Sequence, residues 1–209
     1  MATWGLVHGD ERPISGDRGS GAIMFSGCPL RCPSCHNPEM VAAGVRVTPN
    51  RLAAMAWDLR KRGAENLQLL SPTVHIPALA RVLRHLRGCG FDIPVVFKSS
   101  GYESVNELRK FEGLVDVYLP DVKFGPRSRW AESAGAADYF DEMRRAVEEM
   151  YRQTGPLALS PRGTAVRGVL VRCVPAPLPS RERGTIERFL RTLPKGIHVS
   201  HTAVFDRLG

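Results

Sequence analysis

The sequence predicts an α/β fold built on a mainly parallel sheet, and three observations support this. Short apolar segments alternate with amphipathic segments along most of the chain, a pattern typical of strands joined through helices. Some apolar runs are continuous, such as Val169-Leu170-Val171, which suits strands covered on both faces. With 209 residues, of which 43% are hydrophobic and 24% charged, the chain suffices for one well-buried domain and is short for two.

The elements follow in order from a glycine-rich and charged start. Residues 1–21 predict an irregular segment that leads into the first strand. Six strands are expected, at Ala22–Ser26, Asn66–Leu70, Pro94–Lys98, Val115–Pro120, Gly168–Val174 and Ile197–Ser200. Five helices with apolar residues recurring at three and four are expected between them, at Thr48–Arg62, Ile76–Gly88, Ser104–Phe111, Ala136–Gln153 and Arg183–Leu193. Two architectures fit this alternation, an open doubly wound sheet and a curved partial barrel of six strand-helix units, and periodicity does not separate them.

The net charge of +8 raises the question of nucleic-acid binding, because basic surfaces attract phosphates. Only five of the 29 basic residues are lysines and the arginines are spread along the chain, so the pattern does not favour a nucleic-acid partner. The charge equally suits an anionic cosubstrate or an acidic protein. No apolar run approaches the roughly 20 residues that cross a bilayer, and the N-terminal residues lack a signal-peptide pattern, so we expect a cytoplasmic protein without membrane contact.

The five cysteines divide into a group of three and two isolated residues. Cys28, Cys32 and Cys35 are separated by three and then two residues and directly follow the first predicted strand. Cys89 and Cys173 stand alone in apolar surroundings, and we expect them in structural positions. An odd count with this distribution is not typical of a disulfide framework. Thiolates are soft ligands, so the group of three predicts either an iron–sulfur cluster or a zinc ion.

The two kinds of metal site differ in the ligands that they need. A zinc site would take Cys28, Cys32, Cys35 and His36 as a tetrahedral Cys3His set in an interaction module. The adjacent Cys35 and His36 are poorly placed for this, because neighbouring side chains diverge in most backbones. A four-iron cluster held by three cysteines instead leaves one iron without a protein ligand, and a small molecule can bind there.

The segment from Cys28 to Cys35 resembles the cluster loop of the radical S-adenosylmethionine (SAM) superfamily. Its tail, His-Asn-Pro-Glu at residues 36–39, is similar to that of the activating enzymes typified by pyruvate formate-lyase activase. The resemblance implies that residues 1–209 form a single radical SAM domain with a partial (β/α)6 barrel of parallel strands. It also implies a [4Fe-4S] cluster on the three cysteines, with SAM bound at the open iron. Reductive cleavage of SAM would then give a 5'-deoxyadenosyl radical that abstracts hydrogen from a substrate.

The resemblance further implies partners and substrate classes. A flavodoxin or a ferredoxin would supply the single electron. The tail after the third cysteine points to activation of a glycyl-radical protein, and hydrogen abstraction from a small molecule or a peptide is the alternative. The residue before the third cysteine is usually aromatic in the family and is Ser34 here, so the resemblance leaves only its backbone to meet the adenine amino group.

Four hydroxyl side chains follow the second and third predicted strands, at the sheet edge where parallel α/β folds hold their sites. Ser71 and Thr73 stand where many radical SAM enzymes have a glutamate that binds the amino group of SAM. The resemblance implies that they take its place, and a turn that caps the next helix is the alternative. Ser99 and Ser100 precede Gly101, and the resemblance implies contacts to the ribose, with a simple strand-to-helix turn as the alternative.

Three charged residues belong to the ends of the fourth and fifth predicted strands. Asp121 and Lys123 resemble an activase motif near the carboxylate of SAM, and a structural ion pair is the alternative. Arg172 interrupts an apolar strand, and it needs an acceptor because an unpaired buried guanidinium is costly. The resemblance implies that SAM is this acceptor. No residue is assigned as catalytic or as a radical relay.

Overall fold

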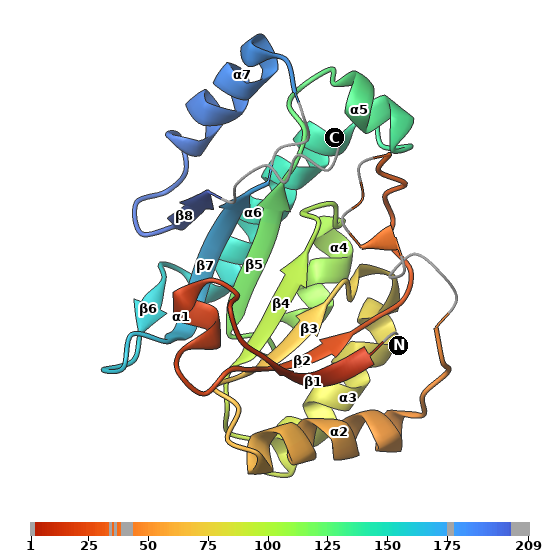
Figure 1. Cartoon of the computed structure of the whole chain (residues 1–209), viewed down its shortest axis with the longest axis vertical. Helices are drawn as coiled ribbons and strands as arrows, with labels where there is room; N and C mark the ends of the chain where they lie inside the picture. The colour runs from red at the N-terminus through yellow and green to blue at the C-terminus, as the bar shows by residue number, and fades with distance from the viewer. Residues whose placement is uncertain (1–2, 34, 36, 39–43, 175–177, 202–209) are drawn as a thin grey trace.

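The computed structural model describes residues 3–33, 35, 37–38, 44–174 and 178–201. Within them, eight strands form one sheet in the order β1-β2-β3-β4-β5-β7-β6, and β8 also pairs with β7 (Figure 1). The strands are β1 Thr3–Val7, β2 Ser20–Met24, β3 Leu67–Leu70, β4 Val95–Ser99, β5 Val117–Val122, β6 Ala158–Leu159, β7 Ala165–Cys173 and β8 His198–His201. Strands β2, β3, β4, β5, β7 and β8 run parallel, whereas β1 and β6 are antiparallel to β2 and β7.

The predicted α/β class with a mainly parallel sheet is confirmed. Each of the six predicted strands is present, with bounds shifted by a few residues. The parallel strands follow one another in chain order, whereas a doubly wound sheet contains a point at which the order reverses. Strand β5 is buried over its whole length, and so are residues 168–171 of β7, as expected for strands covered on both faces.

The helices of the described chain agree with the predicted ones except at α1 and α5. They are α1 Arg12–Ser15, α2 Pro49–Lys61, α3 Ile76–Gly88, α4 Val105–Leu108, α5 Arg129–Ser133, α6 Tyr139–Thr154 and α7 Ser180–Leu190, with short 3-10 turns η2 Thr73–His75 and η3 Arg109–Phe111. The side chain of Thr48 caps α2 by accepting from Arg51 N, and Ser104 caps α4 by accepting from Glu107 N. None of these helices combines the length and the apolar character that crossing a bilayer requires.

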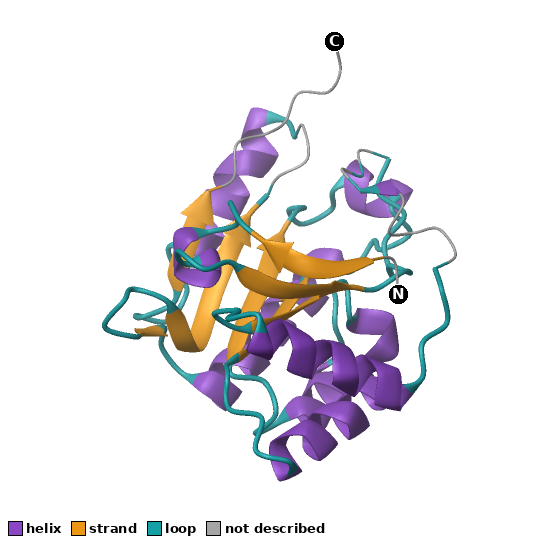
Figure 2. Cartoon of the chain, turned by 60° about the horizontal axis from the view of Figure 1, so that its bottom comes forward, coloured by secondary structure: helices purple, strands orange, loops and turns teal. Residues whose placement is uncertain are grey.

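The helices cover the two faces of the sheet unequally. Helices α2, α3, α4 and α6 lie on one face, and the short α1 lies on the other, which we call the α1 face (Figures 1 and 2). The larger core lies between the sheet and the helix layer and includes Ile23, Leu69, Phe97, Tyr118 and Val171. A smaller core lies on the α1 face, where Ile14 of α1 packs against Val96, Val117, Leu119 and Leu170.

The prediction of an irregular segment over residues 1–21 is wrong, because β1 and α1 form there. Strand β1 is an edge strand whose side chains are only partly buried, so its sequence shows no clear apolar alternation. The glycines that suggested a loop serve tight turns, with Gly16 and Gly19 at φ of 52° and 85°. The charged residues of this segment include partners in ion pairs, such as Arg18 with Glu65.

Strand alternation gathers polar side chains on the α1 face. Successive residues of a strand point to opposite faces of the sheet. Where one residue faces the helix layer, the next residue faces α1. On this face Gln68, Lys98, Asp121 and Arg172 come from four adjacent strands. Lys98, Asp121 and Arg172 lie toward the carboxyl ends of their strands, whereas Gln68 pairs with Val96 of the smaller core. Lys98, Asp121 and Arg172 therefore form a polar row that begins where the smaller apolar core ends.

Candidate functional site

The loop that carries the three cysteines follows β2 directly and is anchored at both ends. Phe25 N donates to Leu70 O at 2.9 Å, so the chain leaves β2 beside the carboxyl end of β3. Gly27 turns the chain with a φ of 89°. Further along, Arg31 N donates to Ala134 O at 3.0 Å, which ties the loop to the end of α5. The loop is thus held across the edge of the sheet.

The three thiols of the loop are free and close enough to interact electrostatically with one another. Cys28 and Cys32 are half-buried, and Cys35 is exposed. Burial raises the pKa of Cys28 and raises that of Cys32 to about 11, while the positive charge of Lys123 opposes both shifts. The predicted ligands are therefore brought together, and a cation lies beside them.

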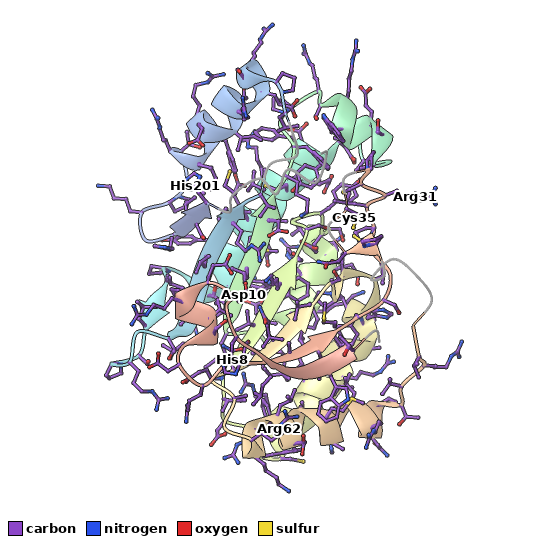
Figure 3. All side chains as sticks on the ribbon, in the orientation of Figure 1. His8, Asp10, Arg31, Cys35, Arg62 and His201 are labelled. Carbon is purple, nitrogen blue, oxygen red and sulfur yellow. The ribbon has the colours of Figure 1, made fainter. Side chains whose placement is uncertain are left out.

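The loop lies at the end of the sheet to which the β4 and β5 arrows point. Figure 3 shows Arg31 and Cys35 on this side of the molecule. Ser34, which we predict to meet the adenine, and His36, the fourth ligand of the zinc alternative, lie outside the described residues.

A buried carboxyl group, Glu103, joins two of the predicted hydroxyls next to the cysteine loop. Thr73 Oγ1 donates to Glu103 Oε1 at 2.7 Å, and Ser99 Oγ donates to Glu103 Oε2 at 3.0 Å. Glu103 is only 1% exposed, and its burial raises its pKa to about 7. Its charge also acts on the thiol of Cys28. Sequence reasoning missed Glu103, although its place just after β4 and Gly101 was an available signal.

Tyr139 of α6 holds the ends of β4 and β5 together. Its hydroxyl donates to Ser100 O or Asp121 O, each 2.8 Å away, and accepts from Lys123 N at 3.0 Å. The tyrosine is fully buried, and burial raises its pKa well above the usual value. Ser100 is buried beside it, and its Oγ has no hydrogen-bond partner among the described residues. This hydroxyl is thus available to a ligand.

Ser71 lies at the end of β3 in a strained conformation. Its φ of 52° falls in the left-handed region, which a residue with a Cβ seldom adopts. Its N donates to Lys98 O at 3.1 Å, so the strain accompanies a bond to the neighbouring strand. The predicted turn before the next helix also forms, because η2 follows at once. Ser71 therefore lies at the carboxyl end of β3, immediately before the turn that contains Thr73.

The three predicted charged residues meet on the α1 face. Lys123 Nζ donates to Asp121 Oδ2 at 2.7 Å, and Asp121 Oδ1 lies 3.1 Å from Arg172 Nε. Burial lowers the pKa of Lys123, but the Asp121 carboxylate outweighs it, so the pKa is raised overall. Lys123 therefore stays charged; it pairs with Asp121 and also interacts electrostatically with the thiols of Cys28 and Cys32.

The acceptors that Arg172 requires come from the N-terminal segment. Its Nε lies 3.1 Å from Glu11 Oε1, and its NH1 lies 3.5 Å from Asp10 Oδ1. Asp10 is also bound by Lys98 Nζ at 2.6 Å and by Gln68 Nε2 at 2.7 Å. Figure 3 shows Asp10 over the middle of the sheet. The charge of Arg172 is thus balanced within the chain by ion pairs to Asp10 and Glu11, two residues that sequence reasoning missed, and to Asp121.

The two acidic residues of this segment titrate differently. Burial is the main reason that the pKa of Glu11 rises to about 7, and the adjacent Asp10 adds to the rise. Burial also favours a raised pKa for Asp10. The interactions of Asp10 with Glu11 and Lys98 outweigh the effect of burial, so the pKa of Asp10 is lowered. Asp10 therefore carries the negative charge that balances Lys98.

Several buried polar atoms on the α1 face make no hydrogen bond to the described part of the chain. They are Glu11 Oε2, Gln68 Oε1, Asp121 Oδ1 and Arg172 Nε, and Ser100 Oγ at the edge of the sheet is another. Arg172 Nε and Asp121 Oδ1 lie within ion-pair distance of each other but are not aligned as a hydrogen bond. Unsatisfied polar atoms of this kind are rare inside proteins, and they favour a polar ligand here.

Comparison with known proteins gives a partial match to a protein of unestablished function. No family model matches the chain. The chain is 28% identical over 137 residues to an uncharacterized protein of Methanocaldococcus jannaschii. The match covers 60% of this chain and 39% of the relative, so the chain spans less than half of that protein's length.

Proposed function

We propose that this chain is a radical SAM enzyme that abstracts hydrogen from a substrate. One observation carries the proposal: three free thiols follow the first parallel strand, interact with one another and lie beside Lys123. Cys28, Cys32 and Cys35 would hold a [4Fe-4S] cluster, because thiolates are the usual ligands of such clusters. Three ligands leave one iron free for SAM.

The ligand set of the loop favours a cluster over a single zinc. A structural zinc takes four protein ligands, and the fourth from this loop would be His36, which is adjacent to Cys35, and neighbouring side chains diverge in most backbones. A four-iron cluster with an open iron needs only the three thiolates. The zinc interaction module becomes an outcome of the tests below.

The strand order supports the partial (β/α)6 barrel and the single radical SAM domain that we include in the proposal. Six parallel strands succeed one another in chain order, and the helix layer lies on one face. The cysteine loop follows the first of these strands, and the polar residues lie at their carboxyl ends, where parallel folds bind ligands. Strand β1 precedes this arrangement as an antiparallel addition.

Different polar residues would bind different groups of SAM. Lys123 offers a cation to the carboxylate of SAM, while Asp121 and Arg172 fix its position through their ion pairs. Ser100 Oγ is free for a ribose hydroxyl. When bound at a reduced cluster, SAM supplies a 5'-deoxyadenosyl radical for hydrogen abstraction.

Glu103 takes the part of the glutamate that the sequence lacks after β3. Thr73 and Ser99 donate to its two carboxyl oxygens and so fix their direction. Its carboxyl interacts electrostatically with the thiol of Cys28, and it would be the acidic partner for the amino group of SAM. In this arrangement Thr73 and Ser99 position Glu103, and Ser71 lies at the end of β3 without a role in binding SAM.

The proposal extends to partners and to two substrate classes. A flavodoxin or a ferredoxin supplies the electron, and a reducing compartment such as the cytoplasm suits a labile cluster and five free thiols. The substrate is a glycyl-radical protein or, as the alternative, a small molecule or peptide. A persistent glycyl radical, detected by electron paramagnetic resonance after incubation with the enzyme, would identify the first class.

Anaerobic reconstitution tests the proposal directly. The protein is loaded with iron and sulfide, reduced in the presence of SAM, and assayed for 5'-deoxyadenosine. Wild type should form this product, and Cys32→Ala should not. Cys89→Ala is the matched control, since Cys89 is an exposed cysteine outside the loop and should leave product formation unchanged. A zinc-loaded, colourless protein that forms no product would refute the assignment.

A further inference from the structure

A second group of metal-ligating side chains lies away from the cysteine loop. Cys173 Sγ, a carboxylate oxygen of Glu187 and a ring nitrogen of His201 all lie within 4.8 Å of one another. They come from the end of β7, from α7 and from the end of β8. Figure 3 shows His201 on the opposite side of the molecule from Cys35. The group therefore takes no part in the site described above.

The fold explains why these residues meet. Cys173 and His201 are partners in the parallel ladder of β7 and β8, so their side chains point to the same face. Cys173 belongs to the core on the helix face, and α7 packs onto that core through Ile186 and Leu190. Glu187 follows Ile186 on the helix, and its Oε1 lies 3.9 Å from His201 Nδ1. The pairing of β7 with β8 and the packing of α7 thus bring the three donor side chains together without a metal ion.

The burial of the three donors is uneven in a way that suits a metal ion. Cys173 is buried, whereas the side chains of Glu187 and His201 are 48% and 58% exposed. An ion can reach the group from solvent, and water can occupy a remaining coordination position. The sulfur is meanwhile shielded from bulk water.

We propose that Cys173, Glu187 and His201 bind a zinc ion that ties α7 and β8 to the end of β7. Zinc accepts sulfur, nitrogen and oxygen donors together in a tetrahedral site, whereas magnesium and calcium prefer oxygen donors alone. A thiolate and a carboxylate balance the two charges of the ion, and neutral histidine adds none. The inference is independent of the radical SAM proposal, because it rests on different residues.

The test must separate this site from the other thiols. A full-length variant with Cys28→Ser, Cys32→Ser and Cys35→Ser removes the donors of the loop and serves as the background. Zn2+ binding to this background is measured by competition with a chromophoric chelator. Co2+ is then used as a coloured substitute, because a cobalt–thiolate bond gives a charge-transfer band in the near ultraviolet.

Single changes in this background identify the donors. The background should bind one equivalent of Zn2+, and Cys173→Ser and His201→Ala should each weaken binding by more than about tenfold, the lower end of what outer-shell changes alone cost. Cys173→Ser should also remove the charge-transfer band of bound Co2+. His201 is exposed, so His201→Ala should not disturb the core. This variant therefore still tests the site if Cys173→Ser does not fold.

Two controls use neighbouring residues of the same type. His198→Ala changes another exposed histidine of β8. Cys89→Ser changes the exposed cysteine that follows α3, whose Sγ lies 3.9 Å from His85 Nε2. Both should leave the Zn2+ affinity unchanged. The proposal is overturned if the background binds no Zn2+, or if His201→Ala and Cys173→Ser bind it as tightly as the background does.

Discussion

At the scale of single residues, Glu103 is a buried acidic group beside the cysteine loop. Two hydroxyls, from Thr73 and Ser99, donate to its carboxyl oxygens, yet no cation lies among its hydrogen-bond partners. Burial therefore dominates and raises its pKa from 4.5 to about 7. A carboxyl group in this state can hold or release a proton close to neutral pH.

The raised pKa of Glu103 predicts how stability depends on pH. The carboxyl of Glu103 stays protonated up to about pH 7 in the folded state, whereas it loses its proton near pH 4.5 in the unfolded state. The contribution of Glu103 to the free energy of unfolding is therefore fully present below pH 4.5 and is lost as the pH rises to 7. Glu103→Gln stays neutral, so above pH 7 it should be more stable than wild type by up to about 3 kcal/mol, and near pH 4.5 about equal. Urea denaturation of the cluster-free proteins between pH 4.5 and 8 measures the difference.

A control for Glu103→Gln is available on the next helix. Glu107→Gln changes an exposed glutamate of α4 and should leave the pH dependence of the wild type intact. Equal pH dependence in wild type and Glu103→Gln would show that Glu103 ionises in the folded protein as readily as it does in water.

At the scale of elements, the N-terminal segment completes the α1 face of the sheet. Ile14 fills the smaller core, and Asp10 neutralises Lys98 and contacts Arg172. Removing one partner of a buried ion pair leaves the other charge unpaired, which is costly. The segment therefore stabilises the strands that carry the site.

Asp10→Asn should destabilise the protein by about 3 kcal/mol at neutral pH, because Lys98 and Arg172 lose a charged partner. The pKa of Asp10 is lowered in the folded protein, so its contribution is present above the unfolded pKa and is lost on acidification. The deficit of the variant should shrink as the pH falls. Asp17→Asn, in an exposed position of the same segment, should cost little, and equal costs for both variants would contradict this account.

The close approach of β4 and β5 depends on a glycine. Gly101 has a φ of 76°, and a Cβ there would lie 2.5 Å from Asp121 O. Gly113 has a similar φ of 74° but open space around it. The two positions separate the cost of backbone strain from the cost of a clash.

Gly101→Ala should destabilise by about 3 kcal/mol, and Gly113→Ala by about 1 kcal/mol, because only the first adds a backbone clash to the unfavourable φ. Urea denaturation compares the two variants. Gly101→Ala should also weaken SAM binding, since it forces apart the strand ends that carry Ser100 and Asp121. Equal losses of stability would indicate that the clash relaxes without cost.

At the scale of the whole molecule, local patterns in the sequence predicted the repeating framework well. The helix at Ile76–Gly88 has the predicted bounds, and the six parallel strands lie within a few residues of their predicted positions. These elements bury continuous or regularly spaced apolar residues, so the signal lies within each segment. The approach of the three cysteines was predictable for the same reason, since they are close in sequence.

Contacts between distant segments were not predictable in this way. Asp10 and Lys98 are 88 residues apart, and Thr73 and Glu103 are 30 apart. Nothing in the local sequence of Asp10 indicates a buried partner, and the segment that contains it was predicted to be irregular. Glu103 was missed because its hydrogen bonds come from Thr73, in the turn after β3, and from Ser99 of β4. The contacts of Asp10 and Glu103 could be identified only from the folded structure, in which the sheet brings distant segments together.

The strand order places the cysteine loop and the polar row at one edge of one sheet, so a cluster held there would lie within reach of both. The most direct measurement of this claim is the iron and acid-labile sulfide content after anaerobic reconstitution. Wild type and Cys89→Ala should each contain about four irons and four sulfides per chain, and Cys28→Ala should contain almost none. Iron content that is unchanged in Cys28→Ala, or one zinc and no iron in wild type, would contradict the account.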